Sequence, residues 1–392
     1  MVRFSLVFSA FLIFVTSGCQ KESDAQTQNN GSLASLSTPR AKVTGVFFIR
    51  QNSLSSSFTD PKCMQNPAGD AQFFVEKCGY IQTCTGTVAQ LDGTSAPFIV
   101  SAAHCDPVDL LQSNSVVSPT TDTSAGTGAD GAIMELSGSE SIQKNGKIFF
   151  HFPSSKNWVE IIQWVNHPSY KNIEEFNLAT TSKNHDLAIG KIRLEDLSKI
   201  KDVASIETKI PEIKPPQEIA SKFESDVKGG PANDALTSFK TTFDRALIDS
   251  FPPADLYGFG ALNNVIVDNK SITGESQKEC DANGRIWSGI ACYTDGQDLR
   301  TTNNTRANTD LRYVNMRVVF SDFSRGFAIF LAPSSYPKGG TCQGDSGGPS
   351  FLGTADTRLF AVESYGPFPC AGSPTVRTIV ATHLPWIESV IR

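Results

Sequence analysis

The sequence has no run of basic residues, no Cys-x-x-Cys pair and no His/Cys cluster with the spacing of a zinc site. Its 34 Lys and Arg residues are outnumbered by 40 Asp and Glu residues, which gives a net charge of −6. A mildly acidic chain has no general attraction to nucleic acid, so we expect no nucleic-acid partner. Without clustered cysteine and histidine ligands, we expect no metal site and no cofactor.

Helical periodicity is also scarce, and no internal repeat is present. Short runs rich in β-branched and aromatic residues recur between turn residues instead, which is typical of β-strands. The clearest runs are 46–49, 98–100, 148–150, 314–320 and 327–331. These many short strands predict an all-β fold, while the pattern alone leaves a sandwich and a barrel open.

The length of 392 residues suffices for two ordinary domains or one large one. One helix is expected near the C-terminus, over His383–Ile391, where apolar residues recur at helical spacing. Three polar stretches, at 51–79, 195–250 and 293–310, are expected to be insertions or long loops, because they are rich in Ser, Pro, Asn, Gly or charged residues.

Residues 1–18 combine a basic residue with a short apolar run and are expected to be a signal peptide. The run is too short to span a bilayer comfortably. The following stretch, Val15-Thr16-Ser17-Gly18-Cys19, is similar to the lipobox of bacterial lipoproteins, in which the cysteine carries lipid. We therefore expect lipidation of Cys19, with a plain secretory signal as the alternative.

Residues 19–42 are expected to be the lipidated cysteine followed by a flexible tether or a pro-segment, because they are polar and lack apolar periodicity. Gln20 follows the cysteine, which in many bacterial lipoproteins indicates the outer membrane. The protein is thus expected to be exported, as an outer-membrane lipoprotein on the periplasmic or cell-surface face, or to be secreted after cleavage. Membrane contact is expected through the lipid only.

The chain contains nine cysteines, and removing Cys19 leaves an even set of eight. Eight cysteines fit four disulfides in an oxidising compartment, although some of them could equally be free thiols. Spacing alone does not choose among the 105 pairings that eight cysteines allow.

Three motifs carry chemistry. Cys342–Pro349 reads CQGDSGGP, in which glycines flank Ser346, and a nucleophilic serine needs such a tight turn with free backbone N–H groups. Ser101–Cys105 (SAAHC) places His104 directly after an apolar run, and Asn184–Ile192 (NHDLAIGKI) places Asp186 before another. The order His, Asp, Ser matches one of the known convergent triads and differs from those of α/β-hydrolases and subtilisins.

These three motifs resemble those of the chymotrypsin–trypsin family of serine proteases. Weaker elements agree with it: Val165–Tyr170 (VNHPSY), Leu256–Gly260 (LYGFG), Ser364–Gly366 (SYG) and Trp386 in the C-terminal segment. The resemblance covers roughly residues 43–392. It implies two six-stranded antiparallel β-barrels, the first over about 43–200 and the second over about 250–392, followed by a C-terminal helix.

The resemblance also implies a function, a serine endopeptidase that hydrolyses peptide bonds in proteins through an acyl-enzyme. Ser346 would attack the carbonyl, His104 would transfer the proton, and Asp186 would orient the imidazole. The N–H groups of Gly344 and Ser346 would form the oxyanion hole. The substrate backbone would pair with Ser364, Tyr365 and Gly366 as an added strand, which favours protein or peptide substrates.

The specificity pocket departs from that of trypsins. The position six residues before the nucleophile is Gly340, so the carboxylate that would bind Lys or Arg is missing. Thr375 stands where the family usually has Gly and would narrow the pocket. We expect a small or medium, uncharged residue before the scissile bond, because an uncompensated cation there would be costly.

The resemblance implies the disulfides Cys84–Cys105 and Cys342–Cys370. The remaining cysteines are close in sequence and could pair locally, Cys63 with Cys78 and Cys280 with Cys292.

The activation segment has no clear match. Family zymogens are cut to free an ammonium that pairs with the Asp beside the nucleophile, here Asp345. The nearest candidate is Pro39–Val46 (PRAKVTGV), with cuts after Arg40 or Lys42. Alternatively, this segment is simply the first strand, and an internal cation meets Asp345.

Two other functions stay open. One is a non-catalytic homologue that binds proteins, since function resides in the site rather than the fold. The other is a different acyl-transfer enzyme such as an esterase, against which the order of the triad argues. We expect a monomer.

Overall fold

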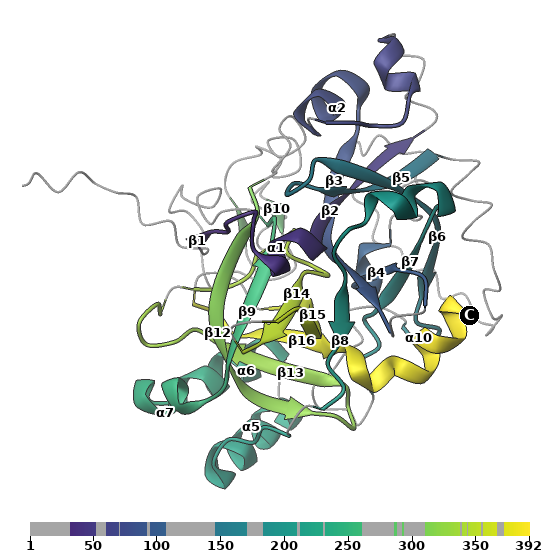
Figure 1. Cartoon of the computed structure of the whole chain (residues 1–392). Helices are drawn as coiled ribbons and strands as arrows, with labels where there is room; N and C mark the ends of the chain where they lie inside the picture. The colour runs from purple at the N-terminus through teal and green to yellow at the C-terminus, as the bar shows by residue number, and fades with distance from the viewer. Residues whose placement is uncertain are drawn as a thin grey trace, which may run out of the picture.

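The computed structural model describes residues 32–51, 60–69, 71–91, 95–106, 146–170, 183–209, 212–229, 232–260, 286–287, 292–293, 310–337, 339–342, 344–353, 356–366 and 372–392. Its main feature is a pair of closed antiparallel β-barrels joined side by side (Figure 1). The predicted all-β fold of two six-stranded barrels with a C-terminal helix is confirmed. No helix in these residues is long and apolar enough to cross a membrane.

The first barrel closes through six pairings, in the order β2-β5-β6-β7-β4-β3 and back to β2. Its strands are β2 (Thr44–Gln51), β3 (Ile81–Gln90), β4 (Phe98–Ser101), β5 (Gly146–Phe152), β6 (Asn157–Asn166) and β7 (Ala188–Ile192). Inside it, the ring of Phe47 contacts Phe150 and Trp164 at centroid distances of 4.8 and 5.2 Å.

The outer face of β2 is covered as well. Phe48 packs on Trp158, which also contacts Phe74 of helix α2 (Ala71–Cys78). This double burial explains why the sequence of β2 reads as a continuous apolar run rather than an alternating one.

The second barrel closes in the order β9-β12-β13-β16-β15-β14 and back to β9. Its strands are β9 (Pro253–Gly258), β12 (Arg312–Asp322), β13 (Phe327–Leu331), β14 (Pro349–Leu352), β15 (Arg358–Tyr365) and β16 (Thr375–Ile379). A short strand between the barrels, β8 (Ala204–Ile206), pairs in parallel with β15 and β3. Two further pairings join β1 (Ser32–Leu33) to β12, and β10 (Ile286–Trp287) to β11 (Cys292–Tyr293).

The stretch 195–250, expected to be an insertion or a long loop, is not a plain loop. It contains a 3-10 turn, η5 (Leu194–Lys199), and three helices: α5 (Gln217–Gly229), α6 (Ala232–Thr241) and α7 (Arg245–Ser250), which lie against the second barrel (Figure 1). Phe223 and Phe239 pack on each other and on Phe320 of β12. The buried faces of α5 and α6 are narrow, so charged and polar residues of the exposed faces dominate the sequence of this stretch and hide its helical pattern.

The stretch 51–79 is likewise not a plain loop, because it holds the 3-10 turn η2 (Pro61–Met64) and helix α2. A disulfide, Cys63–Cys78, joins these two elements. This was the local pairing that seemed possible from the sequence. The stretch 293–310 lies almost wholly outside the described residues.

The C-terminal segment forms the expected helix, α10 (Leu384–Ile391), after a 3-10 turn η7 (Val380–His383). It leaves the second barrel after β16 and packs across the first barrel, where Ile387 is fully buried in the same core as β7 (Figure 1). The helix therefore ties the two barrels together next to the segment that carries Asp186.

Candidate active site

His104 and Asp186 are joined directly. The Nδ1 atom of His104 lies 2.8 Å from Asp186 Oδ2, and the backbone N–H of His104 donates to Oδ1 at 2.9 Å. The side chain of Asp186 is 2% exposed and that of His104 is 19% exposed, so the imidazole alone reaches solvent. This geometry fixes the tautomer with a proton on Nδ1 and leaves Nε2 as the basic nitrogen.

The charge balance at His104 follows from this pair. Burial lowers the pKa of the imidazole, but the charge of Asp186 and the hydrogen bond to it outweigh burial, so the pKa is raised. A carboxylate in contact stabilises the imidazolium. The pair is thus suited to accept a proton at His104.

The loop that holds His104 is fixed by covalent and backbone contacts. Strand β4 ends at Ser101, and residues 103–105 form the 3-10 turn η3 (Ala103–Cys105). The disulfide Cys84–Cys105, which the resemblance implies, anchors this turn to β3. Although Cys84, His104 and Cys105 lie close together, the two cysteines are bonded to each other and offer no thiolate to a metal.

Asp186 is held from three sides. Asn184 Oδ1 accepts from the N–H of Asp186 at 3.1 Å, and Thr378 Oγ1 donates to its carbonyl at 3.0 Å. Ser364 Oγ donates to its carboxylate at 2.7 Å. Ser364 was predicted only as part of the substrate strand, and the structure adds a contact with the Asp186 carboxylate that the sequence did not reveal.

The turn around Ser346 depends on two glycines with positive φ, Gly344 at 94° and Gly347 at 73°. The N–H groups of Asp345, Gly347 and Gly348 all donate to backbone carbonyls. No such bond is made by the N–H groups of Gly344 and Ser346 within the described part of the chain. These are the two donors predicted for the oxyanion hole.

The turn is packed against the loop of His104. The N–H of Thr85 donates to Ser346 O at 2.9 Å, and Thr85 Oγ1 donates to Gly344 O at 2.9 Å. A Cβ on Gly347 would lie 2.0 Å from Ser101 Oγ and 2.8 Å from Ala102 N. The turn of Ser346 on the second barrel thus packs against Ser101 and Ala102, which directly precede the turn that holds His104. No hydrogen bond joins the side chains of Ser346 and His104 among the described contacts.

Asp345 is enclosed beneath the turn. The N–H groups of Cys342 and Gly260 each donate to its carboxylate at 2.7 Å. Burial is the largest effect and raises the pKa of Asp345, although these two bonds and the charges of Arg377 and Arg312 oppose it. Within the described residues, the carboxyl group is therefore held by backbone hydrogen-bond donors.

A buried ion pair lies under the same turn, between Glu363 on β15 and Arg377 on β16. Arg377 Nη1 also donates to Gly348 O at 2.9 Å, and Glu363 accepts a short hydrogen bond from Thr375 Oγ1. Burial raises the pKa of Glu363 and lowers that of Arg377, and each partner's charge opposes that effect. Sequence reasoning missed this pair, because its members are separated by fourteen positions and meet only through strand pairing.

The predicted pocket residues lie close to this pair. Thr341 Oγ1 and Thr375 Oγ1 are 3.1 Å apart, and Gly340 directly precedes Thr341 and is buried. Ser364 and Tyr365 lie at the end of β15, and Gly366 follows it. The predicted pocket residues and the predicted substrate strand thus adjoin strands β15 and β16.

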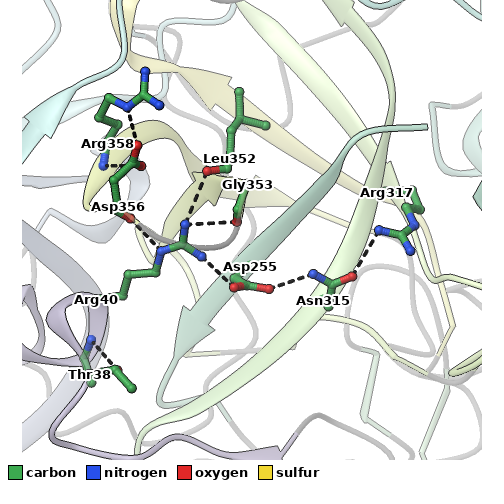
Figure 2. Close-up of polar contacts among 10 residues, drawn as sticks. Thr38, Arg40, Asp255, Asn315, Arg317, Leu352, Gly353, Asp356 and Arg358 are labelled. Atoms are coloured by element: carbon green, nitrogen blue, oxygen red, sulfur yellow. Dashed lines mark hydrogen bonds and ion pairs between the residues drawn. The ribbon is translucent and has the colours of Figure 1, made fainter. Parts of the chain in front are cut away.

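The N-terminal segment is anchored to the second barrel by Arg40 (Figure 2). Residues 39–43 form a short helix, α1 (Pro39–Val43), and the buried Arg40 side chain forms an ion pair with Asp255 of β9 at 2.5 Å. Arg40 also donates to the carbonyls of Leu352, Gly353 and Asp356. Lys42 is exposed, and β2 begins directly after α1, at Thr44. The candidate segment 39–46 is therefore a short helix followed by the start of a strand, and not simply the first strand.

Several predicted residues lie outside the described part of the chain. They are the signal peptide, Cys19, the first part of the tether, Cys280 and Cys370. Cys342 is itself in a disulfide, but its expected partner is among these residues. The side chain of Cys292 is also outside the description.

The comparison with sequence families gives one match. The sequence model of the trypsin family matches residues 287–387, a segment that contains Ser346 but neither His104 nor Asp186. No curated protein matches the chain by sequence.

Solved structures give similarities of low identity. Mouse neuropsin, described as a serine protease, is 13% identical with a TM-score of 0.40, covering 92% of this chain and 98% of its own. Human heparin binding protein is 12% identical with a TM-score of 0.42, covering 92% and 94%. The protease Anisep from Arthrobacter nicotinovorans is 10% identical with a TM-score of 0.37, covering 86% and 90%. At these values the functions of those proteins do not transfer to this chain.

Proposed function

We propose that this protein is a serine endopeptidase of the trypsin family that hydrolyses peptide bonds in proteins through an acyl-enzyme. The observation that carries the proposal is the combination of the His104–Asp186 pair with a glycine turn in which the N–H groups of Gly344 and Ser346 bond no backbone carbonyl of the described residues. A hydrolase that acts through a serine needs a base, a nucleophile and an oxyanion hole in one place.

In this mechanism, Ser346 Oγ attacks the scissile carbonyl carbon while its proton passes to His104 Nε2. Asp186 keeps the other imidazole proton on Nδ1 and stabilises the imidazolium. The negative charge on the substrate oxygen is bound by the N–H groups of Gly344 and Ser346. His104 then donates its proton to the leaving amine, and water repeats the sequence to release the acyl group.

The test compares the purified protein with its Ser346→Ala variant on a fluorescent protein substrate and on a peptide library. We expect hydrolysis by the first and none by the second, with small or medium uncharged residues before the scissile bond. This preference is supported by the ion pair between Glu363 and Arg377, because the buried carboxylate is already compensated and is not available to bind a Lys or Arg side chain of the substrate. A library profile dominated by Lys or Arg would contradict the proposed specificity, and equal hydrolysis by both proteins would contradict the function.

We further propose that activity does not require a cut after Arg40. The guanidinium of Arg40 is buried and bonded to the second barrel, and Asp345 already has internal hydrogen-bond donors. A protease that requires Arg at its cleavage site must first extract this side chain. Full activity in protein whose residues 32–43 are intact by mass spectrometry would support this, and activity only after cleavage would refute it.

Export and lipidation of Cys19 are also proposed, from the sequence alone. Metabolic labelling with a radioactive fatty acid should mark the wild-type chain and leave a Cys19→Ala variant unmarked. Equal labelling of both would contradict the lipid anchor.

A further inference from the structure

Three histidines that the proposed mechanism does not use lie together behind Asp186. His167 follows β6, His185 precedes Asp186, and His383 ends η7. Their candidate ligand atoms lie within 4.8 Å of one another. The rings of His167 and His185 are stacked at 4.2 Å, and His383 meets them edge-on at 5.0 and 5.4 Å. Three of the five histidines in the chain thus occupy one place.

Two of the imidazole nitrogens in this cluster are buried without a hydrogen bond. They are His185 Nδ1 and His383 Nε2, neither of which has a partner among the described residues. Buried polar atoms are nearly always bonded, so each of these nitrogens needs a partner, such as water or a metal ion, that the described residues do not supply. His383 Nδ1 lies 2.9 Å from Thr382 Oγ1 and 3.2 Å from Ile379 O. Because the Thr382 hydroxyl itself donates to Ile379 O, both partners accept from Nδ1, and metal-binding histidines commonly donate from the non-ligating nitrogen in this way.

The three rings offer lone pairs rather than positive charge. Burial is the main cause that lowers the pKa of His167 to about 4 and that of His383 to about 3, and it also lowers the pKa of His185. The cation that faces the cluster is Lys183, whose pKa burial also lowers and whose amine donates to Thr382 O at 2.5 Å. Neutral imidazoles are the form that binds metal.

We propose that His167, His185 and His383 form a binding site for one divalent transition-metal ion, with Zn²⁺ as the expected ion and water as the fourth ligand. Three imidazoles and an open position are a ligand set that zinc accepts, whereas Mg²⁺ and Ca²⁺ prefer oxygen. The sequence did not predict this site, because its ligands are separated by 18 and 198 positions and the fold alone unites them.

Binding requires a small contraction of the cluster. Zn–N bonds of about 2.0–2.1 Å in a tetrahedron place the nitrogens about 3.4 Å apart, closer than the present 4.8 Å limit. His167 Nδ1 now accepts from the N–H of Ser169 at 3.2 Å. Ligation through its Nε2 atom would move the proton to Nδ1 and give up this long hydrogen bond.

The site is coupled to Asp186 by the backbone. The N–H of Leu187 donates to His185 O at 2.7 Å, and the N–H of His167 donates to Leu187 O at 2.9 Å. Drawing His185 toward the other two rings therefore displaces the segment that presents Asp186 to His104. We infer that the bound metal reversibly inhibits hydrolysis, a step that rests on the proposed function.

Binding is tested first on untagged Ser346→Ala protein, so that the result does not depend on peptidase activity. Titration with Zn²⁺ by calorimetry should give one ion per chain, and Co²⁺ should give the visible absorption of a tetrahedral site. Separate His167→Gln, His185→Gln and His383→Gln variants should each bind at least about 100-fold more weakly, because even an outer partner contributes 10–100-fold.

The matched control is His151→Gln, which removes a buried histidine outside the cluster, whose ring contacts that of Trp158 at a centroid distance of 4.4 Å. It should bind Zn²⁺ as the parent does. Thermal unfolding shows which variants fold. If the His167 and His383 variants do not fold, the affinity of His185→Gln decides the test, because His185 is the least buried of the three histidines. Absence of saturable binding, or unchanged affinity in the folded cluster variants, would overturn the site.

The inhibition is tested on the protein with Ser346 intact. Zn²⁺ should lower the rate of hydrolysis, a chelator should restore it, and His383→Gln should resist the metal. Equal inhibition of the parent and this variant would refute the coupling to Asp186, since the metal would then act elsewhere.

Discussion

Replacing Arg40 by Met is expected to loosen the N-terminal segment from the second barrel and to expose it to proteases. The change keeps an unbranched apolar stem, which can still lie against Phe351, but removes the guanidinium that bonds Asp255 and three carbonyls (Figure 2). Asp255 would then keep Asn315 as its hydrogen-bond donor. The lost interactions lie in the interior, where Arg40 is 4% exposed.

The magnitude follows from the burial of the pair. Removing one partner of a buried ion pair costs about 3–5 kcal/mol, because the other charge is left uncompensated. Asp255 is 16% exposed and retains one donor, so we expect the lower end, about 3 kcal/mol. Adding Asp255→Asn to Arg40→Met removes the uncompensated charge and should restore part of the lost stability. The coupling energy between the two substitutions should be about 1–3 kcal/mol.

The assay is urea unfolding of the parent, the two single variants and the double variant, all with Ser346→Ala to prevent self-cleavage. Limited trypsin digestion, read by mass spectrometry, should cut the parent at neither Arg40 nor Lys42 until it unfolds, because the helix α1 would have to open. A loss below about 1 kcal/mol in Arg40→Met, or rapid cleavage after Arg40 in the folded parent, would refute the role of this anchor.

Three further predictions test the site. Because the pKa of His104 is raised and the imidazolium cannot act as a base, the acid limb of the pH–rate profile should lie above the ordinary histidine pKa of about 6.5. An acid limb at or below about 6.5 in the parent would contradict the pairing with Asp186. Asp186→Asn should lower kcat about 10⁴-fold. Gly347→Ala should prevent folding or assembly of the turn, because its Cβ would lie 2.0 Å from the side-chain oxygen of Ser101. The control Gly353→Ala has a similar φ and open space around it, so it should cost only about 1 kcal/mol. Similar melting temperatures in the two variants would refute the packing of the turn. Ser364→Ala removes one bond to a carboxylate and should lower kcat/KM roughly 10–100-fold; an unchanged value would exclude a positioning role.

The barrel strands and the three motifs could be predicted because they leave local signals. Runs such as Phe98–Val100 and Phe327–Leu331 lie in strands, since apolar β-branched and aromatic residues are packed on both faces. The helix at the C-terminus was predicted from its spacing. Ser346 stood out because its flanking glycines are needed in a turn with positive φ.

Other features depend on contacts between distant segments. Among the described residues, the helices α5 and α6 bury Phe223, Phe239 and a few neighbours, and the polar residues around them hide this amphipathic pattern in the sequence. Arg40 looked like a cleavage site, because the sequence does not show that Asp255 lies beside it. The Glu363–Arg377 pair and the histidine cluster are likewise products of strand pairing and barrel packing.

The central claim is that Ser346 is an activated nucleophile. The most direct test is labelling of the purified protein with a fluorophosphonate, followed by peptide mapping, beside the Ser346→Ala and Asp186→Asn variants. We predict a single adduct on Ser346, none in the alanine variant and much slower labelling in the asparagine variant. Absence of labelling in the folded, intact protein, or an adduct on another residue, would contradict the assignment of this site.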